Sequence, residues 1–462
     1  MTGGDITGNA SGSGNGVNIS GNITDGVISG GATGNGSGVD ISGNSTLTNT
    51  TVNGNGTDGS GVNISGNLTS SGNSTVTGNA SGNGNGVNIS GNITDGVISG
   101  GATGNGSGVD ISGNSTLTNT TVNGNGTDGS GVNISGNLTS SGNSTVTGNA
   151  SGSGNGVNIS GNITDGVISG GATGNGSGVD ISGNSTLTNT TVNGNGTDGS
   201  GVNISGNLTS SGNSTVTGNA SGNGTGVDIN GTVTGGDITG NASGSGNGVN
   251  ISGNITDGVI SGGATGNGSG VDISGNSTLT NTTVNGNGTD GSGVNISGNL
   301  TSSGNSTVTG NASGNGTGVD INGTVTGGDI TGNASGSGNG VNISGNITDG
   351  VISGGATGNG SGVDISGNST LTNTTVNGNG TDGSGVNISG NLTSSGNSTV
   401  TGNASGNGTG VDINGTVTGG DITGNASGSG NGVNISGNIT DGVISGGATG
   451  MAPVWTSAAT AP

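Results

Sequence analysis

The chain has 462 residues, of which 122 are glycine, and it contains no Lys, Arg, His, Cys, Phe or Tyr. Its 23 acidic residues are all Asp and give a formal charge of −23 at pH 7. Nucleic acids and anionic lipids are bound mainly through Lys and Arg, so we expect neither as a partner. No apolar run approaches the roughly 20 residues of a spanning helix, so we expect no membrane insertion.

The sequence is strongly periodic. The signature Gly-Val-(Asn/Asp)-Ile occurs nineteen times, at spacings of 22, 23 or 25 residues. Residues 11–80, 81–150 and 151–220 form near-identical blocks of 70 residues, and from Ser221 an added unit lengthens the block to 92. A period of this size predicts a solenoid. A disordered glycine-rich chain is the alternative, because composition without a period is typical of disorder.

Short β-branched segments follow one another within each repeat. Val17, Asn18 and Ile19 alternate apolar and polar, which predicts a strand with one buried face. Ile23 and Ile28 begin further apolar segments in the same repeat, and Gly-Asn, Asp-Gly and Ser-Gly turn dipeptides separate them. We therefore predict an all-β protein, a right-handed parallel β-helix (β-solenoid) of about nineteen rungs of 22–25 residues that spans residues 1–450.

The polar residue inside the signature alternates between Asn and Asp. Successive repeats carry Asn18, Asp40, Asn63, Asn88 and Asp110, and two consecutive repeats never both carry Asp. In stacked rungs, adjacent carboxylates would lie about 4.8 Å apart and repel each other by roughly 1–3.5 kcal/mol. This pattern favours stacking, although it could also record only how the repeats were duplicated.

The two ends differ from the repeat. Back-translation of the expected Asn-Gly-Ser-Gly-Val-Asp-Ile-Ser-Gly-Asn-Ser-Thr with permissible codons, read one base out of frame, gives Met-Ala-Pro-Val-Trp-Thr-Ser-Ala-Ala-Thr-Ala-Pro, which is residues 451–462. Met1 stands where the matching repeat has Val233. We therefore expect residues 451–462 to be an out-of-frame tail without structure, and the chain to be a fragment of a longer protein.

Catalytic chemistry has little support in this composition. Acid–base, nucleophilic and metal catalysis mostly use His, Cys, Lys, Tyr or clustered carboxylates, and only dispersed Asp is present. Gly36 to Asp40 resemble the start of a calcium-binding nonapeptide repeat, but the spacing and the apolar position differ. We expect no enzyme activity and no catalytic, cofactor-binding or metal-binding residues.

Asn-x-Ser/Thr sequons are the strongest local signal. Residues 315–406 contain fifteen Asn, of which thirteen begin a sequon. Asn and the hydroxyl residue two places later share one face of a strand, so an N-glycosyltransferase would meet both together. Turn and ladder chemistry alone also favours Asn beside Ser or Thr. The candidate N-glycosylation residues are Asn322, Asn333, Asn342, Asn346, Asn368, Asn373, Asn391, Asn397 and Asn403.

The recurring segments GVNISGN and GVDISGN, in long near-identical blocks, resemble the repeat region of filamentous-haemagglutinin-like exoproteins of the two-partner secretion class. The resemblance covers residues 1–450 and depends on repeat style. It implies a secreted or cell-surface bacterial adhesin in the form of a right-handed parallel β-helix. It further implies export through an outer-membrane transporter partner, sequon modification by a glycosyltransferase, and attachment to glycans or glycoproteins on host cells.

Two other functions remain open. A passive spacer or inactive fragment would need no binding site. Ice binding would use flat Thr and Asn ladders, but the Thr-rich run at residues 45–51 occurs only once in each 70- or 92-residue block, which argues against it.

Overall fold

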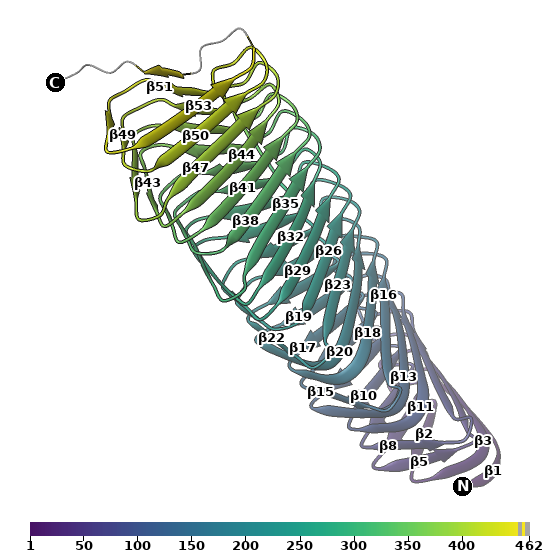
Figure 1. Cartoon of the computed structure of the whole chain (residues 1–462). Coiled ribbons are helices and arrows are strands. Elements are labelled where there is room, and N and C mark those ends of the chain that lie inside the picture. Colours follow the sequence, from purple (N-terminus) through teal and green to yellow (C-terminus); the bar gives the residue numbers. More distant parts are fainter. Residues whose placement is uncertain (451–454, 458–462) are drawn as a thin grey trace. The chain divides into compact units, whose positions relative to one another are not determined.

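The computed structural model describes residues 1–450 and 455–457. Two compact units are present, Met1–Gly231 and Thr232–Pro462, here called the N-terminal unit and the C-terminal unit. The described residues form no helix, and each unit is a stack of parallel strands (Figure 1). About nineteen rungs are present in all. The predicted all-β parallel β-helix is therefore confirmed, and a disordered chain is excluded for the described residues.

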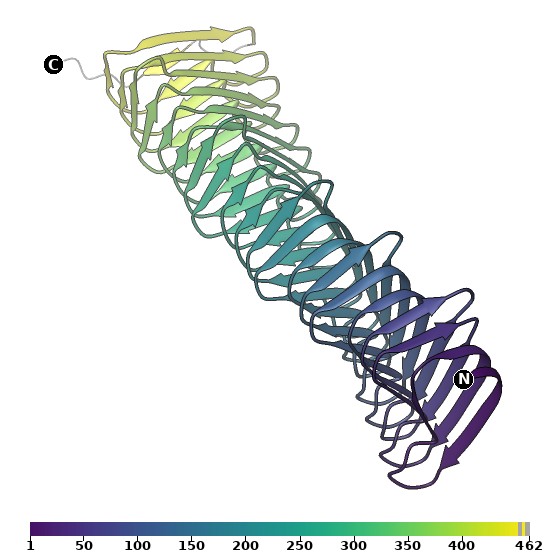
Figure 2. The same cartoon turned by 90° about the horizontal axis from the view of Figure 1, so that it is seen from below.

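One rung illustrates the coil. The signature strand β4 (Val39–Ser42) is followed by β5 (Ser45–Thr48) and then by β6 (Thr51–Gly56), after which a loop leads to the next signature strand. The chain thus passes three faces in each rung, which we call the signature face, the short-strand face and the long-strand face. Figure 2 shows these strands and loops as successive coils.

The rungs stack in register, so that like residues form columns. Val39 pairs with Val62, and Ile41 pairs with Ile64, and all four are fully buried. Leu47 and Val52 are also fully buried on the other two faces. Alternate residues of each strand therefore point into one continuous aliphatic core, as period-2 patterning requires.

Four kinds of rung alternate, distinguished by sequence. We call them rung A (for example residues 87–108), rung B (109–131), rung C (132–156) and rung D (319–340). Three strands per rung were predicted, but in several A and B rungs the second and third strands are continuous. Examples are β11 (Ile93–Ala102) and β13 (Ser115–Gly126). Asp95 and Asn119 lie at the bend with φ of 49° and 47°, a region that Asp and Asn tolerate better than other side chains.

Glycine is required where the coil is narrow. A Cβ at Gly54 would overlap the carbonyl oxygen of Gly61 and would lie 2.7 Å from Cγ2 of Val62. The same contact recurs along the stack, for example at Gly78 and Gly124. The end of each long strand therefore packs directly on the start of the next signature strand, which explains part of the glycine content.

The signature strands of the N-terminal unit are β2 (Val17–Ser20), β4, β7 (Val62–Ser65), β10 (Val87–Ser90), β12 (Val109–Ser112), β14 (Val132–Ser135), β17 (Val157–Ser160), β19 (Val179–Ser182), β21 (Val202–Ser205) and β24 (Val227–Ile229). Its other strands are β1 (Thr2–Ala10), β3 (Ile23–Ala32), β5, β6, β8 (Leu68–Ser71), β9 (Thr75–Ala80), β11, β13, β15 (Leu138–Ser141), β16 (Thr145–Ala150), β18 (Ile163–Ala172), β20 (Ser185–Gly196), β22 (Leu208–Ser211) and β23 (Thr215–Ala220).

The signature strands of the C-terminal unit are β27 (Val249–Ile251), β30 (Val271–Ser274), β33 (Val294–Ser297), β36 (Val319–Ile321), β39 (Val341–Ile343), β42 (Val363–Ser366), β45 (Val386–Ser389), β48 (Val411–Ile413) and β51 (Val433–Ile435). Its short strands are β25 (Val233–Thr234), β28 (Ile255–Thr256), β31 (Ser277–Thr280), β34 (Leu300–Ser303), β37 (Val325–Thr326), β40 (Ile347–Thr348), β43 (Ser369–Thr372), β46 (Leu392–Ser395), β49 (Val417–Thr418) and β52 (Ile439–Thr440). Its long strands are β26 (Asp237–Ala242), β29 (Val259–Ala264), β32 (Thr283–Gly288), β35 (Thr307–Ala312), β38 (Asp329–Ala334), β41 (Val351–Ala356), β44 (Thr375–Gly380), β47 (Thr399–Ala404), β50 (Asp421–Ala426) and β53 (Val443–Ala448).

Most of the predicted out-of-frame tail lies outside the described residues. Of residues 451–462, the structure describes only β54 (Trp455–Ser457), whose backbone pairs in parallel with β51. The expectation that the tail is unstructured remains a prediction for the other nine residues.

Candidate glycan-acceptor and polar faces

An asparagine occupies the corner between the signature strand and the short strand in rungs A, B and C. In the C-terminal unit these corner asparagines include Asn346, Asn368 and Asn391, all exposed. Oδ1 of Asn346 accepts the N–H of Thr370 at 2.9 Å, and Oδ1 of Asn368 accepts the N–H of Asn391 at 3.0 Å. Oδ1 of Asn391 accepts both the N–H and the hydroxyl of Thr416 at 2.9 Å. The carbonyl end of each corner amide is therefore fixed by the next rung.

Unlike the side-chain oxygen, the side-chain nitrogen of these three residues forms no hydrogen bond to the next rung that the structure describes. Within the described residues, Nδ2 of Asn346, Asn368 and Asn391 donates no hydrogen bond. Nδ2 is the atom that an N-glycosyltransferase modifies, so a sugar could be attached here without loss of a contact in the fold. We call this set, with its equivalents in other rungs, the corner column.

The hydroxyl residue of each corner sequon lies on the same side of the chain. Asn346 is followed by the buried Ile347 and then by Thr348, which is half-buried at the surface. Thr348 pairs with Thr372 of the next rung on the short-strand face. The Asn and the Thr of the sequon therefore project outward together, as the sequence pattern predicted for an extended segment.

Four of the predicted acceptor residues donate through Nδ2 into ladders that cross the rungs. Asn342 is half-buried and donates to Asp320 Oδ1 at 2.8 Å, and the exposed Asn373 donates to Asp349 Oδ1 at 3.0 Å. The other two, also exposed, donate to the Asn Oδ1 of the preceding rung: Asn333 to Asn311 at 3.1 Å and Asn403 to Asn379 at 3.0 Å. Glycosylation would replace one of the two hydrogens on a nitrogen that already holds the stack together.

Asn322 and Asn397 complete the predicted set. Both are exposed, and Nδ2 of neither donates within the described residues. Oδ1 of Asn322 accepts the hydroxyl of Ser344 at 2.8 Å, whereas Asn397 uses only its backbone N–H, toward Asn373 Oδ1 at 3.4 Å. The nine sequons thus divide into five with an unengaged amide nitrogen and four without one.

The electrostatic pattern of the signature face follows from the same ladders. Asp364 accepts from two amides, Asn339 Nδ2 to Oδ2 at 3.1 Å and Asn387 Nδ2 to Oδ1 at 2.7 Å. In the ladder, Asp364 lies between Asn342 and Asn387, so its carboxylate has an amide on each adjacent rung and no second carboxylate. In the part of the chain that is described, no three acidic side chains gather into a group that could hold a metal ion.

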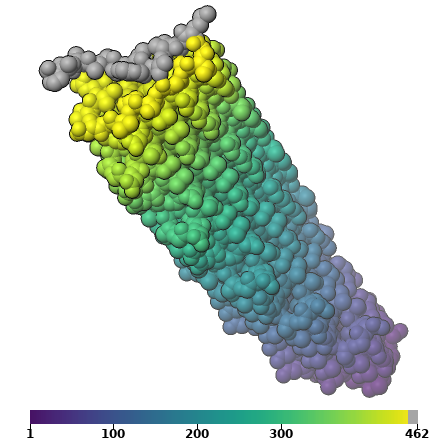
Figure 3. Space-filling model, viewed as in Figure 1, coloured from purple at the N-terminus to yellow at the C-terminus, as the bar shows by residue number. Residues whose placement is uncertain are grey.

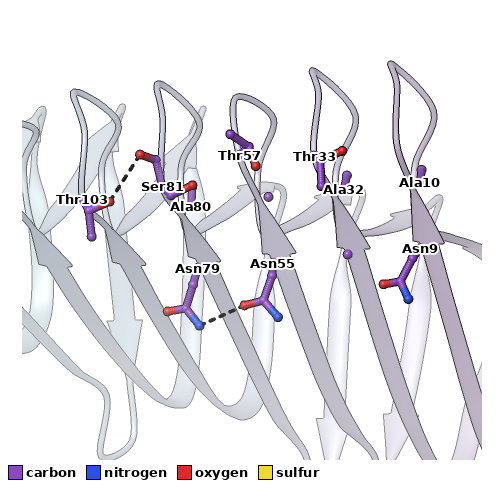
Figure 4. Close-up of a pocket in the computed structure, with 12 residues that line it drawn as sticks. Asn9, Ala10, Ala32, Thr33, Asn55, Thr57, Asn79, Ala80, Ser81 and Thr103 are labelled. Carbon is purple, nitrogen blue, oxygen red and sulfur yellow. Dashed lines mark hydrogen bonds between the residues drawn. The ribbon is translucent and has the colours of Figure 1, made fainter.

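A shallow groove of about 570 Å³ crosses the first rungs of the N-terminal unit, at the ends of the long strands. Figure 4 shows its lining, which comprises the amides of Asn9, Asn55 and Asn79, alanine methyls, and hydroxyls such as that of Thr103. Asn79 Nδ2 lies 3.4 Å from Asn55 Oδ1. The next rung has Gly101 in this column, so the asparagine ladder is interrupted there. The groove is open and its lining mixes apolar surface with amides and hydroxyls, without the convergent acid, base or nucleophile that catalysis needs.

No known protein family, curated protein or solved structure matches this chain. The division among the sequons therefore depends on this chain alone. Sequence reasoning found all nine sequons but could not divide them, because the division depends on which atoms face the next rung. One signal was available: corner sequons follow Gly and precede an apolar or Ser residue and then Thr, whereas the signature sequon follows Val.

Proposed function

We propose that the chain is a repeat segment of a large secreted bacterial adhesin that attaches to glycans or glycoproteins on host cells. The observation that supports it is the repetition of exposed polar columns from rung to rung over a core that does not change. Within each unit, the space-filling view shows successive parts of the chain packed against one another on the visible face (Figure 3). Such a surface would present the same weak glycan-binding site once in each repeat.

Multiplicity supplies affinity that a single site of this kind lacks. The chain has no Arg, Lys, Tyr or Phe, the residues that usually anchor a ligand strongly. When several weak contacts engage at once, the later ones form at high effective concentration, and avidity can exceed a single affinity by about 10²–10⁴-fold. A repeated face therefore suits a host surface on which the same glycan recurs many times.

We further propose that the protein is exported through an outer-membrane transporter partner and is modified by a glycosyltransferase, with the corner column as the principal acceptor. The protein would then be secreted or held on the bacterial surface. In the described part of the chain, no helix is both long enough and apolar enough to cross a membrane. We expect neither an enzyme activity nor a nucleic-acid partner, because the groups that such functions use are lacking from the composition.

The experiment is a cell-binding assay with the full chain, produced alone and together with an N-glycosyltransferase. We expect saturable binding to host epithelial cells that a multivalent glycan inhibits far better than the same glycan in monovalent form. A passive spacer would bind in neither preparation, and that result would refute the adhesin proposal. Loss of binding after enzymatic removal of host surface glycans would identify the class of receptor.

A further inference from the structure

The long-strand face of the N-terminal unit carries an uninterrupted, uncharged column. Val97 pairs with Thr121, Thr121 with Thr145, and Thr145 with Val167. The column begins at Val27 and continues through nine rungs, and each member is β-branched and partly or largely exposed. Its members are Val27, Thr51, Thr75, Val97, Thr121, Thr145, Val167, Thr191 and Thr215.

A second outward column runs beside the first. It consists of Ser, Asn and Thr, two residues further along each strand, as in the series Ser99, Asn123 and Thr147. Parallel strands lie about 4.8 Å apart, and residues i and i+2 lie about 6.6 Å apart along a strand. The two columns therefore form a regular two-dimensional array of methyl, hydroxyl and some amide groups, which we call the hydroxyl array.

The hydroxyls of the first column are free to bind water. Within the described residues, Oγ1 of Thr121 and Oγ1 of Thr145 take part in no hydrogen bond. Carboxylates lie at the borders of the array: Asp5 at its first end, where it pairs with Val27, bend residues such as Asp95, and loop residues such as Asp128. Asp95 Oδ1 accepts from Asn119 Nδ2 at 3.0 Å.

The corresponding column of the C-terminal unit is different, because rung D places Asp in it. Asp329 pairs with Thr307 on one side and with Val351 on the other, and Asp329 is exposed. A carboxylate binds water strongly and in its own geometry, so it interrupts a lattice of neutral groups. Asp5 occupies the same position in the first rung of the N-terminal unit, where it pairs with Val27, so the uninterrupted array is the stretch of nine rungs from Val27 to Thr215.

We infer that the hydroxyl array of the N-terminal unit binds ice. A rigid, repeated surface of this kind can order the first layer of water into a lattice that matches ice. The methyl groups limit the orientations of this water, and the hydroxyls form hydrogen bonds to it. The Thr-rich run at residues 45–51 recurs only once per block, which argued against ice binding. The observed register answers this argument. The Thr or Val that begins each Thr-Val-Thr or Val-Ile-Ser segment of the other rungs lies in the same column, so every rung from Val27 to Thr215 contributes one residue.

The test measures thermal hysteresis and retention on an ice surface with the full unglycosylated chain. We expect measurable hysteresis, and at least a tenfold loss of activity in the double variant Thr51→Asp, Thr121→Asp, whose two new carboxylates lie three rungs apart in equivalent B rungs. The fold should tolerate these changes, because Asp329 occupies the same position in rung D. A thermal melt followed by circular dichroism shows whether both proteins are equally folded.

The matched control places the same two charges on the short-strand face, as Thr69→Asp with Thr139→Asp. Thr69 and Thr139 occupy equivalent, exposed positions of rung C. We expect this variant to retain the wild-type hysteresis. Absence of hysteresis and of ice retention in the wild-type chain would overturn the inference, as would an equal loss in the test and control variants. Binding to host cells is measured separately, so failure here leaves the adhesin proposal unaffected.

Discussion

Asn63 donates its side-chain amide to Oδ1 of Asp40 at 2.8 Å, across the space between two rungs. On the far side, Asn63 Oδ1 accepts from Asn88 Nδ2, also at 2.8 Å. An amide can donate and accept, whereas a carboxylate only accepts, so an Asp in this ladder needs an amide on the neighbouring rung. This requirement is a physical reason for the Asn and Asp alternation along the signature face.

The first prediction concerns this ladder. Asn63→Asp would place two carboxylates on adjacent rungs and remove a donor, so we expect the free energy of unfolding to fall by about 1–3 kcal/mol. The loss should shrink at high salt, because screening weakens the repulsion. Urea unfolding followed by circular dichroism at low and high salt measures both effects.

The control for the ladder variant adds the same charge elsewhere. Asn143 is exposed, and its side chain makes no hydrogen bond within the described residues. Asn143→Asp should therefore change stability by no more than about 0.5 kcal/mol. Equal losses in the two variants would contradict the ladder argument and would indicate a general effect of net charge.

The second prediction concerns the narrow part of the coil. Gly54→Ala would force a methyl group against the carbonyl oxygen of Gly61, and backbone cannot move aside without shifting the whole rung. We expect destabilisation of about 1–3 kcal/mol. At Gly12 an added Cβ meets nothing within 4 Å, so Gly12→Ala should be close to neutral. A neutral Gly54→Ala would show that the interior is looser than the structure indicates.

The third prediction compares two serines of one rung. Ser302 is 8% exposed, and its hydroxyl has no hydrogen-bond partner, whereas Oγ of Ser306 donates to Ser303 O at 2.7 Å and accepts from Thr282 N at 3.1 Å. We expect Ser302→Ala to be neutral or stabilising, and Ser306→Ala to cost about 1–3 kcal/mol. Unfolding midpoints of the two variants give the comparison. The opposite order would mean that Ser302 is hydrogen-bonded in solution, for instance to a buried water.

Much of the fold was predictable, because its main determinants are local and repeated. The alternation at Val17, Asn18 and Ile19 and the narrow range of signature spacings, 22 to 25 residues, were enough to predict parallel rungs over an aliphatic core. The continuous β13 was not predictable, because Asn119 looks like a turn residue in the sequence, yet it serves as a bend within one strand. The local sequence specifies the backbone conformation at Asn119, but it does not specify whether hydrogen-bonded strand pairing continues on both sides of that bend.

The site was predictable only as a list of sequons. Asn342 and Asn346 are four residues apart and both begin an Asn-Ile-Ser/Thr segment, yet only Asn342 donates through its amide nitrogen to another rung. This difference arises from contacts between residues 22 or more positions apart. The long-strand column is similar: its Thr and Val come from different rung sequences, and only the register makes them neighbours.

The last prediction uses this difference between the sequons. When the folded full chain is treated with a soluble N-glycosyltransferase and its sugar donor, we expect at least tenfold higher occupancy at corner sequons, such as Asn346, Asn368 and Asn391, than at signature sequons, such as Asn342. The amide nitrogens of Asn346, Asn368 and Asn391 donate no hydrogen bond within the described residues, and these three side chains are exposed, whereas Asn342 is half-buried and its Nδ2 donates to Asp320. The same treatment of urea-unfolded chain should reduce the difference, because the ladder is then absent.

Mass spectrometry can separate the two classes although the repeats are nearly identical. Trypsin would find no site in a chain without Lys and Arg, and a protease that cleaves at Asp leaves Asn342 and Asn346 in one peptide, between Asp329 and Asp349. Fragmentation of that peptide with the sugar retained locates the modified residue, because the signature Asn342 follows Val and the corner Asn346 follows Gly. Equal occupancy of both classes on the folded chain would show that the ladder does not protect its amides. Occupancy that favours the corner column only after folding would show that the stacking of rungs selects the acceptor residues.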